Sequence, residues 1–303
     1  MKRRDILKYT SLFGIGIASS PEILWSNAVK NAQINNRKFL LKNKFISEYS
    51  PKSLPKLSSL KARLHWNENP FGPNPEAIKK FNHYSKKGNY YSWDILDDFV
   101  KKIARKEGVK PGNIMMGPGS SDLLEKVGMV LFQRTGNIIA ADPCYMSLIN
   151  VISAFGGEWK PIKLNNKFEH DLTKMKLSID SNTRLIYITN PNNPTATITN
   201  HEKLYSFCDE VSSKIPVFVD EAYLEISEGG LKNSMVGLVS KGRDVIITRT
   251  FSKIHGMAGL RLGYMIASEE RIKKISKITR GGMGIAGPTI HAAMESVDDK
   301  EFL

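Results

Sequence analysis

The sequence predicts an α/β protein with a mostly parallel sheet that is covered by helices on both faces. Short, continuously apolar stretches alternate with longer amphipathic ones along most of the 303 residues. These apolar stretches lack the polar alternation of a strand that faces water on one side, which favours strands buried on both faces. The composition, with 41% hydrophobic and 24% charged residues, is that of a globular protein and excludes collagen, an extended coiled coil and wholesale disorder.

The elements are predicted in order from Glu76 onward. Ser92 is a suitable N-cap for an amphipathic helix that runs to about Lys106. Further helices are expected from the turn at 117–122 through 132, at 145–155 and at 201–212. Strands are expected at 114–116, 137–141, 185–189, 216–219, 245–248 and 262–267. Ligands of such sheets bind at the carboxyl ends of the strands, so candidate site residues are expected just after the strands.

Net charge and cysteine content exclude several kinds of site. Lysine and arginine number 44 against 30 acidic residues, which gives a formal charge of +14. The basic residues are spread along the chain without a basic run interleaved with aromatics, as is typical of a solvated, lysine-rich surface. Cys144 and Cys208 are too few for a disulfide scaffold and form no metal-ligand pattern. We therefore expect neither a nucleic-acid partner nor a metal site.

Residues 1–28 are predicted to be an export signal. The paired arginines Arg3-Arg4 precede a weakly apolar stretch at 9–18, and Ser26-Asn27-Ala28 places small residues where a signal peptidase would cut. The apolar stretch is shorter than the about 20 residues that a membrane-spanning helix needs. The pattern resembles a twin-arginine signal, so we expect a periplasmic or otherwise exported protein with no membrane span after signal removal. A frayed basic terminus is the alternative.

Lys253 is the first candidate catalytic residue. It follows the strand 245–248 in Thr250-Phe251-Ser252-Lys253, and a lysine held near a sheet loses its proton more easily than one in water. A neutral lysine can form a Schiff base with an aldehyde. Arg261, together with Thr250 and Ser252, could grip a phosphate because arginine matches phosphate oxygens as a fork of donors. Taken alone, Lys253 would be interpreted as a surface lysine, since lysines are common along the chain, and it is the neighbouring residues that favour a site.

Other candidate groups follow other strands. Asp220 could pair with a pyridinium nitrogen, although an isolated Asp-Glu after a strand is also typical of a helix cap or a magnesium ligand. Gly117-Pro118-Gly119-Ser120-Ser121 offers free backbone N–H groups at a helix start, a ready anion site. The turn at 190–195 is rigid, since it holds two prolines and three asparagines. Tyr145 places an aromatic ring at another strand end, where core packing would be its ordinary role.

In this order the motifs resemble the pyridoxal-phosphate-dependent aminotransferases of fold type I, class I/II, and most of all the histidinol-phosphate aminotransferase branch. Any one motif is weak, whereas the ordered set is specific and covers about residues 62–303. The matching segments are 67–73, 117–122, 143–145, 190–195, 220–223, 249–253 and 259–263.

The resemblance implies pyridoxal 5'-phosphate as cofactor and a role for each group. Lys253 would hold the cofactor as a Schiff base and shuttle the proton between substrate and cofactor. Asp220 would keep the pyridine nitrogen charged, and Tyr223 and Asn193 would bind the phenolic oxygen of the ring. Tyr145 would stack on the ring face. The phosphate would be held by Ser120, Ser121, Thr250, Ser252 and Arg261.

The resemblance also implies a homodimer, an activity and a domain organisation. A tyrosine of the Tyr90-Tyr91 pair, by alignment Tyr91, would reach the phosphate of the neighbouring subunit. The implied reaction is transamination between an amino acid and a 2-oxo acid. A phospho-amino-acid decarboxylase and a truncated cofactor-binding protein without turnover are the alternatives. Residues 29–61 would be a linker or N-terminal arm and 62–280 the large, cofactor-binding domain. The segment 281–303 would begin a small C-terminal domain that is largely missing, together with its carboxylate-binding arginine.

One position departs from the family's pattern within the predicted site. The turn at 190–195 normally continues into a glycine, and here Ala196 stands in its place. If the backbone has a positive φ at this residue, the alanine carries a strain of roughly 1 kcal/mol.

Overall fold

The computed structural model describes residues 61, 63, 64 and 66–299. The predicted export signal at 1–28 and nearly all of the predicted arm at 29–61 lie outside these residues. Within the described part of the chain, no helix has both the length and the apolar character needed to cross a membrane.

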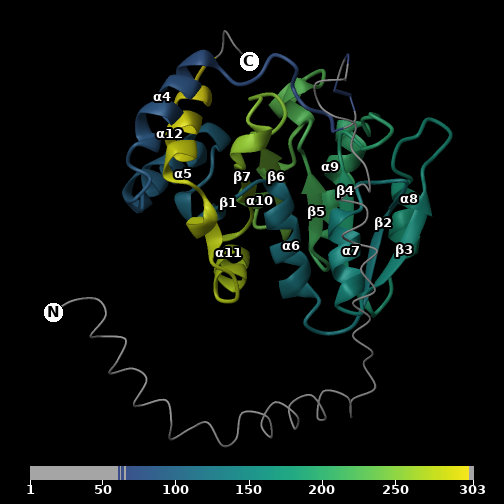
Figure 1. Ribbon diagram of the computed structural model, residues 1–303. Coiled ribbons are helices and arrows are strands. Elements are labelled where there is room, and N and C mark those ends of the chain that lie inside the picture. Colours follow the sequence, from purple (N-terminus) through teal and green to yellow (C-terminus); the bar gives the residue numbers. More distant parts are fainter. Residues whose placement is uncertain (1–60, 62, 65, 300–303) are drawn as a thin grey trace, which may run out of the picture. The chain divides into compact units, whose positions relative to one another are not determined.

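The described residues form a seven-stranded sheet with the order β1-β7-β6-β5-β4-β2-β3 (Figure 1). All neighbouring strands from β6 to β3 are parallel, whereas β7 runs antiparallel to both β1 and β6. The mostly parallel sheet predicted from the sequence is therefore confirmed. The strands are β1 Ile114–Gly117, β2 Asn137–Asp142, β3 Glu158–Lys163, β4 Thr183–Thr189, β5 Val217–Asp220, β6 Val245–Thr250 and β7 Gly263–Ile266.

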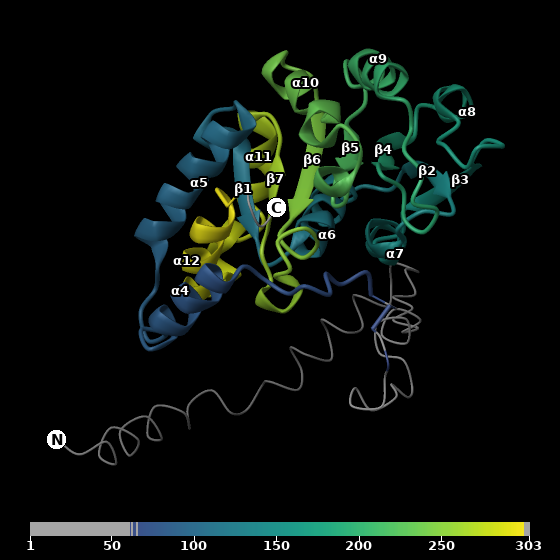
Figure 2. The same cartoon turned by 90° about the horizontal axis from the view of Figure 1, so that it is seen from above.

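Helices cover both faces of this sheet. Side chains of α5, α9, α10 and α12 pack into the hydrophobic core on one face, and those of α6, α7 and α11 into the core on the other (Figure 2). The helices are α4 Pro75–Ser85, α5 Trp93–Glu107, α6 Ser120–Leu131, α7 Ser147–Ala154, α8 Leu172–Leu177, α9 His201–Val211, α10 Val236–Ser240, α11 Glu269–Ser276 and α12 Gly287–Ser296.

Local sequence pattern predicted the buried elements better than the exposed ones. All six expected strands are present, whereas β3 was not expected. This strand lies at the edge of the sheet and has no buried position, and charged residues such as Glu158 and Lys163 are exposed in it, so it lacks an apolar run. The helix predicted from Tyr145 begins at Ser147, which leaves Tyr145 in the loop after β2. Ser92 precedes α5 as predicted, although its side chain makes no capping hydrogen bond.

A buried ion group joins the sheet to α5. The guanidinium of Arg249, which is 1% exposed, lies 3.2 Å from Glu107 of α5 and 3.0 Å from Glu221 after β5. It also donates to the Ser234 hydroxyl at 2.9 Å, and the Tyr264 hydroxyl of β7 donates to Glu107 at 2.6 Å. Because buried charges are costly without partners, this group holds the ends of β5 and β6 in register with α5.

The last described helix, α12, belongs to the same core. Ile290 and Ala293 are buried in the cluster that also holds residues of α4 and α5, and the rings of Tyr84 and His291 stack between α4 and α12. The domain boundary expected after residue 280 stays a prediction.

Candidate active site

Three of the predicted site residues, Asn193, Tyr223 and Lys253, line a cavity of about 990 Å³ that lies beyond the carboxyl ends of β4, β5 and β6. Its walls come from four parts of the chain that are separated in the sequence. These are the segment 67–71, the turn between Pro191 and Ile198, and the loops that carry Tyr223 and Lys253. The parallel order of β4, β5 and β6 brings the turn and the two loops together, because these strands end at one edge of the sheet.

Lys253 follows β6 and points its amine into this cavity. Its Nζ donates to the main-chain carbonyls of Trp66 at 3.2 Å and Asn67 at 3.0 Å, and lies 5.2 Å from the centre of the Tyr223 ring. Burial lowers the pKa of the Lys253 amine, while the nearby carboxylates of Asp220 and Glu68 oppose this shift. A lysine with a lowered pKa is neutral more often, and the neutral form is the nucleophile.

Asp220 ends β5 and is 5% exposed. Burial raises the pKa of its carboxyl from the usual 3.8 to about 6. Hydrogen bonds to the carboxylate favour its charged form and partly oppose this rise. Both donors reach the same oxygen: the Thr248 hydroxyl donates to Oδ1 at 3.0 Å, and the Ala222 N–H donates to it at 3.2 Å. The carboxylate is thus held in one orientation, and its other oxygen remains the one suited to a protonated ligand nitrogen.

Tyr223 lies near both of these groups. Its hydroxyl oxygen accepts a hydrogen bond from the Asn67 amide at 3.1 Å. Burial raises the pKa of the Tyr223 phenol, and the bond from Asn67 partly offsets this rise. Asn193 is half-buried and lines the same cavity, so the structure brings together the two residues expected to bind a phenolic oxygen.

A second cluster, at the start of α6, is the candidate anion site. The N-cap of this helix is Gly119, with φ 93° and no capping side chain, so the first N–H groups of the helix are left for a ligand. The Arg261 guanidinium lies over this glycine, donating to the Pro118 carbonyl at 3.3 Å and to the Ser252 hydroxyl at 3.4 Å. A Cβ at Gly119 would stand 2.2 Å from Arg261 Nη2, so the close approach requires glycine.

The remaining expected phosphate and ring ligands border this cluster. The Ser121 hydroxyl is 3.4 Å from the hydroxyl of Tyr145, and Ser120 opens the helix beside it. Thr250 is buried, and its hydroxyl accepts from the Ser252 N–H at 3.1 Å. The Thr250 hydroxyl thus supports the loop that carries Ser252 and Lys253.

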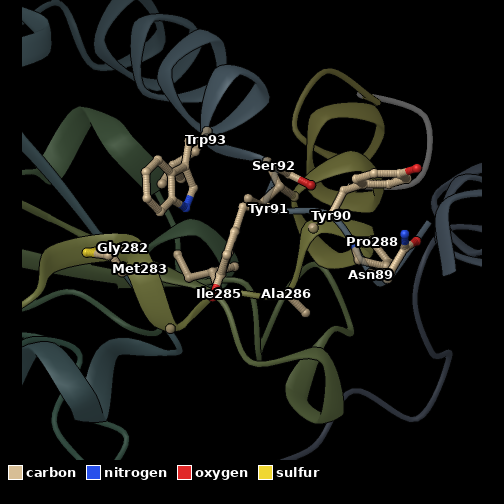
Figure 3. Close-up of a pocket in the computed structure, with 15 residues that line it drawn as sticks. Asn89, Tyr90, Tyr91, Ser92, Trp93, Gly282, Met283, Ile285, Ala286 and Pro288 are labelled. Carbon is tan, nitrogen blue, oxygen red and sulfur yellow. The ribbon is translucent and has the colours of Figure 1, made fainter. Parts of the chain in front are cut away.

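Tyr91 lies in a different part of the structure. It is 84% exposed, and its ring centre is 5.3 Å from that of Trp93. Figure 3 shows both residues in a separate pocket of about 550 Å³, where the Tyr91 ring extends toward Ile285 while Tyr90 points away. Within one chain, Tyr91 is therefore not brought to Lys253.

Sequence reasoning missed two residues that shape the site. Asn67 belongs to a motif that was recognised without a role for the residue. Thr248 is the partner of Asp220 in the pairing of β5 with β6, which a residue count back from each strand end could have indicated. Among the described residues, no group of three or more His, Cys, Asp or Glu side chains is arranged to hold a metal ion.

The arrangement fits the cofactor implied by the sequence motifs. A lysine with a lowered pKa suits an aldehyde, a fixed carboxylate suits a ring nitrogen, and a glycine N-cap under an arginine suits a phosphate. All three lie at the carboxyl edge of one sheet.

Comparisons with known proteins agree with this site. Residues 61–303 match the family model described as aminotransferase class I and II. The chain is 34% identical over 241 residues to a histidinol-phosphate aminotransferase of Caldicellulosiruptor saccharolyticus, covering 80% of this chain and 67% of the relative. It is also 34% identical over 217 residues to one of Moorella thermoacetica, covering 71% of this chain and 56% of that relative.

Solved structures share the fold. The histidinol-phosphate aminotransferase of Sinorhizobium meliloti in complex with pyridoxal-5'-phosphate superposes with a TM-score of 0.72 at 24% identity, over 80% of this chain and 65% of that one. The chain thus spans between about half and two thirds of the length of these relatives. With the match of residues 61–303 to the family model, the chain belongs to the class I and II aminotransferases.

Proposed function

We propose that this protein is a pyridoxal-phosphate-dependent enzyme that transfers an amino group between an amino acid and a 2-oxo acid. The observation that carries the proposal is that the Lys253 amine, which lines the cavity, and the fixed Asp220 carboxylate follow or end the neighbouring strands β6 and β5. Family membership supports it, as do the relatives named as aminotransferases and the solved neighbour with pyridoxal phosphate bound.

Each residue has a defined task in this proposal. When bound, pyridoxal phosphate supplies a protonated aromatic ring that withdraws electrons from the substrate carbon. Asp220 keeps the proton on the ring nitrogen, and Tyr223 with Asn193 binds the phenolic oxygen. The Lys253 amine attaches the cofactor and later moves a proton to and from the substrate carbon. The N-terminus of α6 and Arg261 bind the phosphate.

Covalent labelling tests the cofactor site. Borohydride reduction of the protein with pyridoxal phosphate, followed by peptide mapping, should find the pyridoxyl group on Lys253. Lys253→Ala should abolish the label and the visible absorbance, whereas Lys241→Ala, at a lysine remote from the cavity lining, should leave both intact. Label on a different lysine, or none in folded protein with excess cofactor, would refute the assignment.

Product analysis tests the reaction. The protein is incubated with panels of amino acids and 2-oxo acids, and both the new amino acid and released carbon dioxide are measured. Transamination yields a new amino acid without carbon dioxide. Carbon dioxide release would instead identify a decarboxylase, and labelling without either product would identify a cofactor-binding protein without turnover.

We also propose that the active form is a homodimer in which Tyr91 reaches the anion site of the neighbouring copy. Large apolar side chains are exposed around the pocket in Figure 3, including Tyr91, Trp93 at 56% and Met283 at 54%. Light scattering should give twice the mass of one chain, and Tyr91→Phe should weaken cofactor binding without changing that mass. A cofactor-loaded monomer would contradict the proposal.

Export through the twin-arginine route is a further part of the proposed function. Its support is the paired arginines Arg3 and Arg4 before a weakly apolar stretch. Changing both to lysine should leave unprocessed precursor in the cytoplasm, as measured by fractionation and immunoblotting. Unchanged periplasmic accumulation would show that the pair is not read as a signal.

A further inference from the structure

Asn67 lies where the two reactive groups of the cavity meet. Its main-chain carbonyl accepts from Lys253 Nζ at 3.0 Å, and its side-chain amide donates to the Tyr223 hydroxyl oxygen at 3.1 Å. Its backbone has φ 51°, in the left-handed region that asparagine tolerates better than most residues. One residue from a distant part of the chain therefore contacts both the candidate nucleophile and the candidate phenol.

The segment around Asn67 is anchored independently of this contact. The Asn69 amide donates to the Ile254 carbonyl at 2.9 Å, and the Asn69 side-chain oxygen accepts from the Phe71 N–H at 3.0 Å. The main chain at Gly72 lies very close to that of Gly256. A Cβ added to Gly256 would stand 2.0 Å from the Gly72 carbonyl oxygen. These contacts hold the backbone of residues 69–72 against residues 254–256, without involving the Asn67 side chain.

The direction of the Asn67 bond has a chemical consequence. An amide nitrogen can only donate, so the bond occupies the phenol oxygen as an acceptor. The phenolic O–H is then free to donate toward the cavity. We propose that Asn67 is a positioning residue that orients the Tyr223 hydroxyl as a hydrogen-bond donor to the ligand in the cavity.

This inference deepens the proposed function and rests on it for the identity of the ligand, but the contact itself is testable without cofactor. The titratable groups that face Tyr223 are Asp220 at the end of β5, Tyr145 after β2 and Lys253 after β6. A donor to the phenol oxygen stabilises the phenolate, and its removal should therefore raise the pKa of Tyr223.

The test follows Tyr223 by carbon-13 NMR in cofactor-free protein with tyrosine labelled at Cζ. The chain holds ten tyrosines, and the Tyr223 signal is the one absent from a Tyr223→Phe sample. Asn67→Gly removes the amide and suits the positive φ, and Asn67→Asp keeps the shape but replaces the donor with an acceptor. Asn69→Ala is the matched control, because it loosens the same segment without touching Tyr223.

The titration midpoint of Tyr223 should move upward in Asn67→Gly and in Asn67→Asp, and stay at the wild-type value in Asn69→Ala. With pyridoxal phosphate added, the dissociation constant of the cofactor should rise about tenfold in Asn67→Gly, as expected for one lost hydrogen bond. An unchanged midpoint in both Asn67 variants, or an equal shift in Asn69→Ala, would overturn the proposal. Because the titration needs no cofactor, a protein that fails to bind pyridoxal phosphate would overturn the proposed function and leave this result standing.

Discussion

Asp220 should make the cofactor-free protein less stable as the pH rises from about 4 to about 6. Burial raises the pKa of this carboxyl from 3.8 to about 6 in the folded protein. The folded state therefore holds the proton more tightly than the unfolded state does. As the pH rises through this window the unfolded chain loses its proton first, so the free energy of unfolding falls, and above about pH 6 the full loss remains.

The size of the effect follows from the two pKa values. A difference of about two units corresponds to about 3 kcal/mol, since each unit is worth about 1.4 kcal/mol. Asp220→Asn removes the titration while keeping the shape, and the amide oxygen can still accept from the Thr248 hydroxyl and the Ala222 N–H. The variant should therefore gain about 3 kcal/mol relative to the wild type between pH 4 and pH 7.

Urea unfolding followed by circular dichroism measures this difference at a series of pH values. Groups that titrate in both proteins, such as His170 and His255, cancel in the comparison. Asp97→Asn, at a carboxylate whose side chain is 65% exposed, is the control and should show no such pH-dependent gain. If the difference between wild type and Asp220→Asn stays constant from pH 4 to pH 7, the burial argument for Asp220 is wrong.

Three further substitutions test other features. Ala196→Gly should raise the free energy of unfolding by about 1 kcal/mol because φ is 57° at this residue, whereas the control Ala154→Gly, at the last residue of α7, should not raise it. Arg249→Leu should lower it by roughly 3–5 kcal/mol in urea unfolding, since it leaves two buried glutamates unpaired, and Lys101→Met at an exposed ion pair should leave the midpoint unchanged. Gly119→Ala should weaken cofactor binding at least about tenfold in a fluorescence titration, because the new Cβ displaces the arginine above it; unchanged affinity would contradict that geometry.

Buried parallel strands made much of the fold predictable from the sequence. Their continuous apolar runs are local signals. The residues that follow these runs, such as Asp220 and Lys253, are therefore predicted to lie at the carboxyl edge of the sheet. The turn motif raised a positive φ at Ala196 as a condition for strain, and φ is 57° at this residue. Each of these inferences needed only neighbours in sequence.

The features that the sequence did not predict depend mainly on contacts between residues far apart in the chain. β6 extends to Thr250, two residues beyond the predicted end, because Thr250 pairs with Gly263 of β7. Asn67 and Tyr223 are 156 residues apart, and nothing in either segment alone indicates that they bond. Edge strand β3 has charged residues where an apolar run would be needed to recognise it. Long-range pairing and edge exposure therefore limited the prediction.

The anchoring of the segment at residues 66–72 sets the order in which the site can form during synthesis. Asn69 leaves the ribosome 185 residues before Ile254, whose carbonyl it binds. At about 5–20 residues per second, roughly 10–40 seconds separate the two halves of this contact. Throughout that interval the segment has no partner at the lysine loop, so the cavity is completed only after β6 has emerged and joined the sheet.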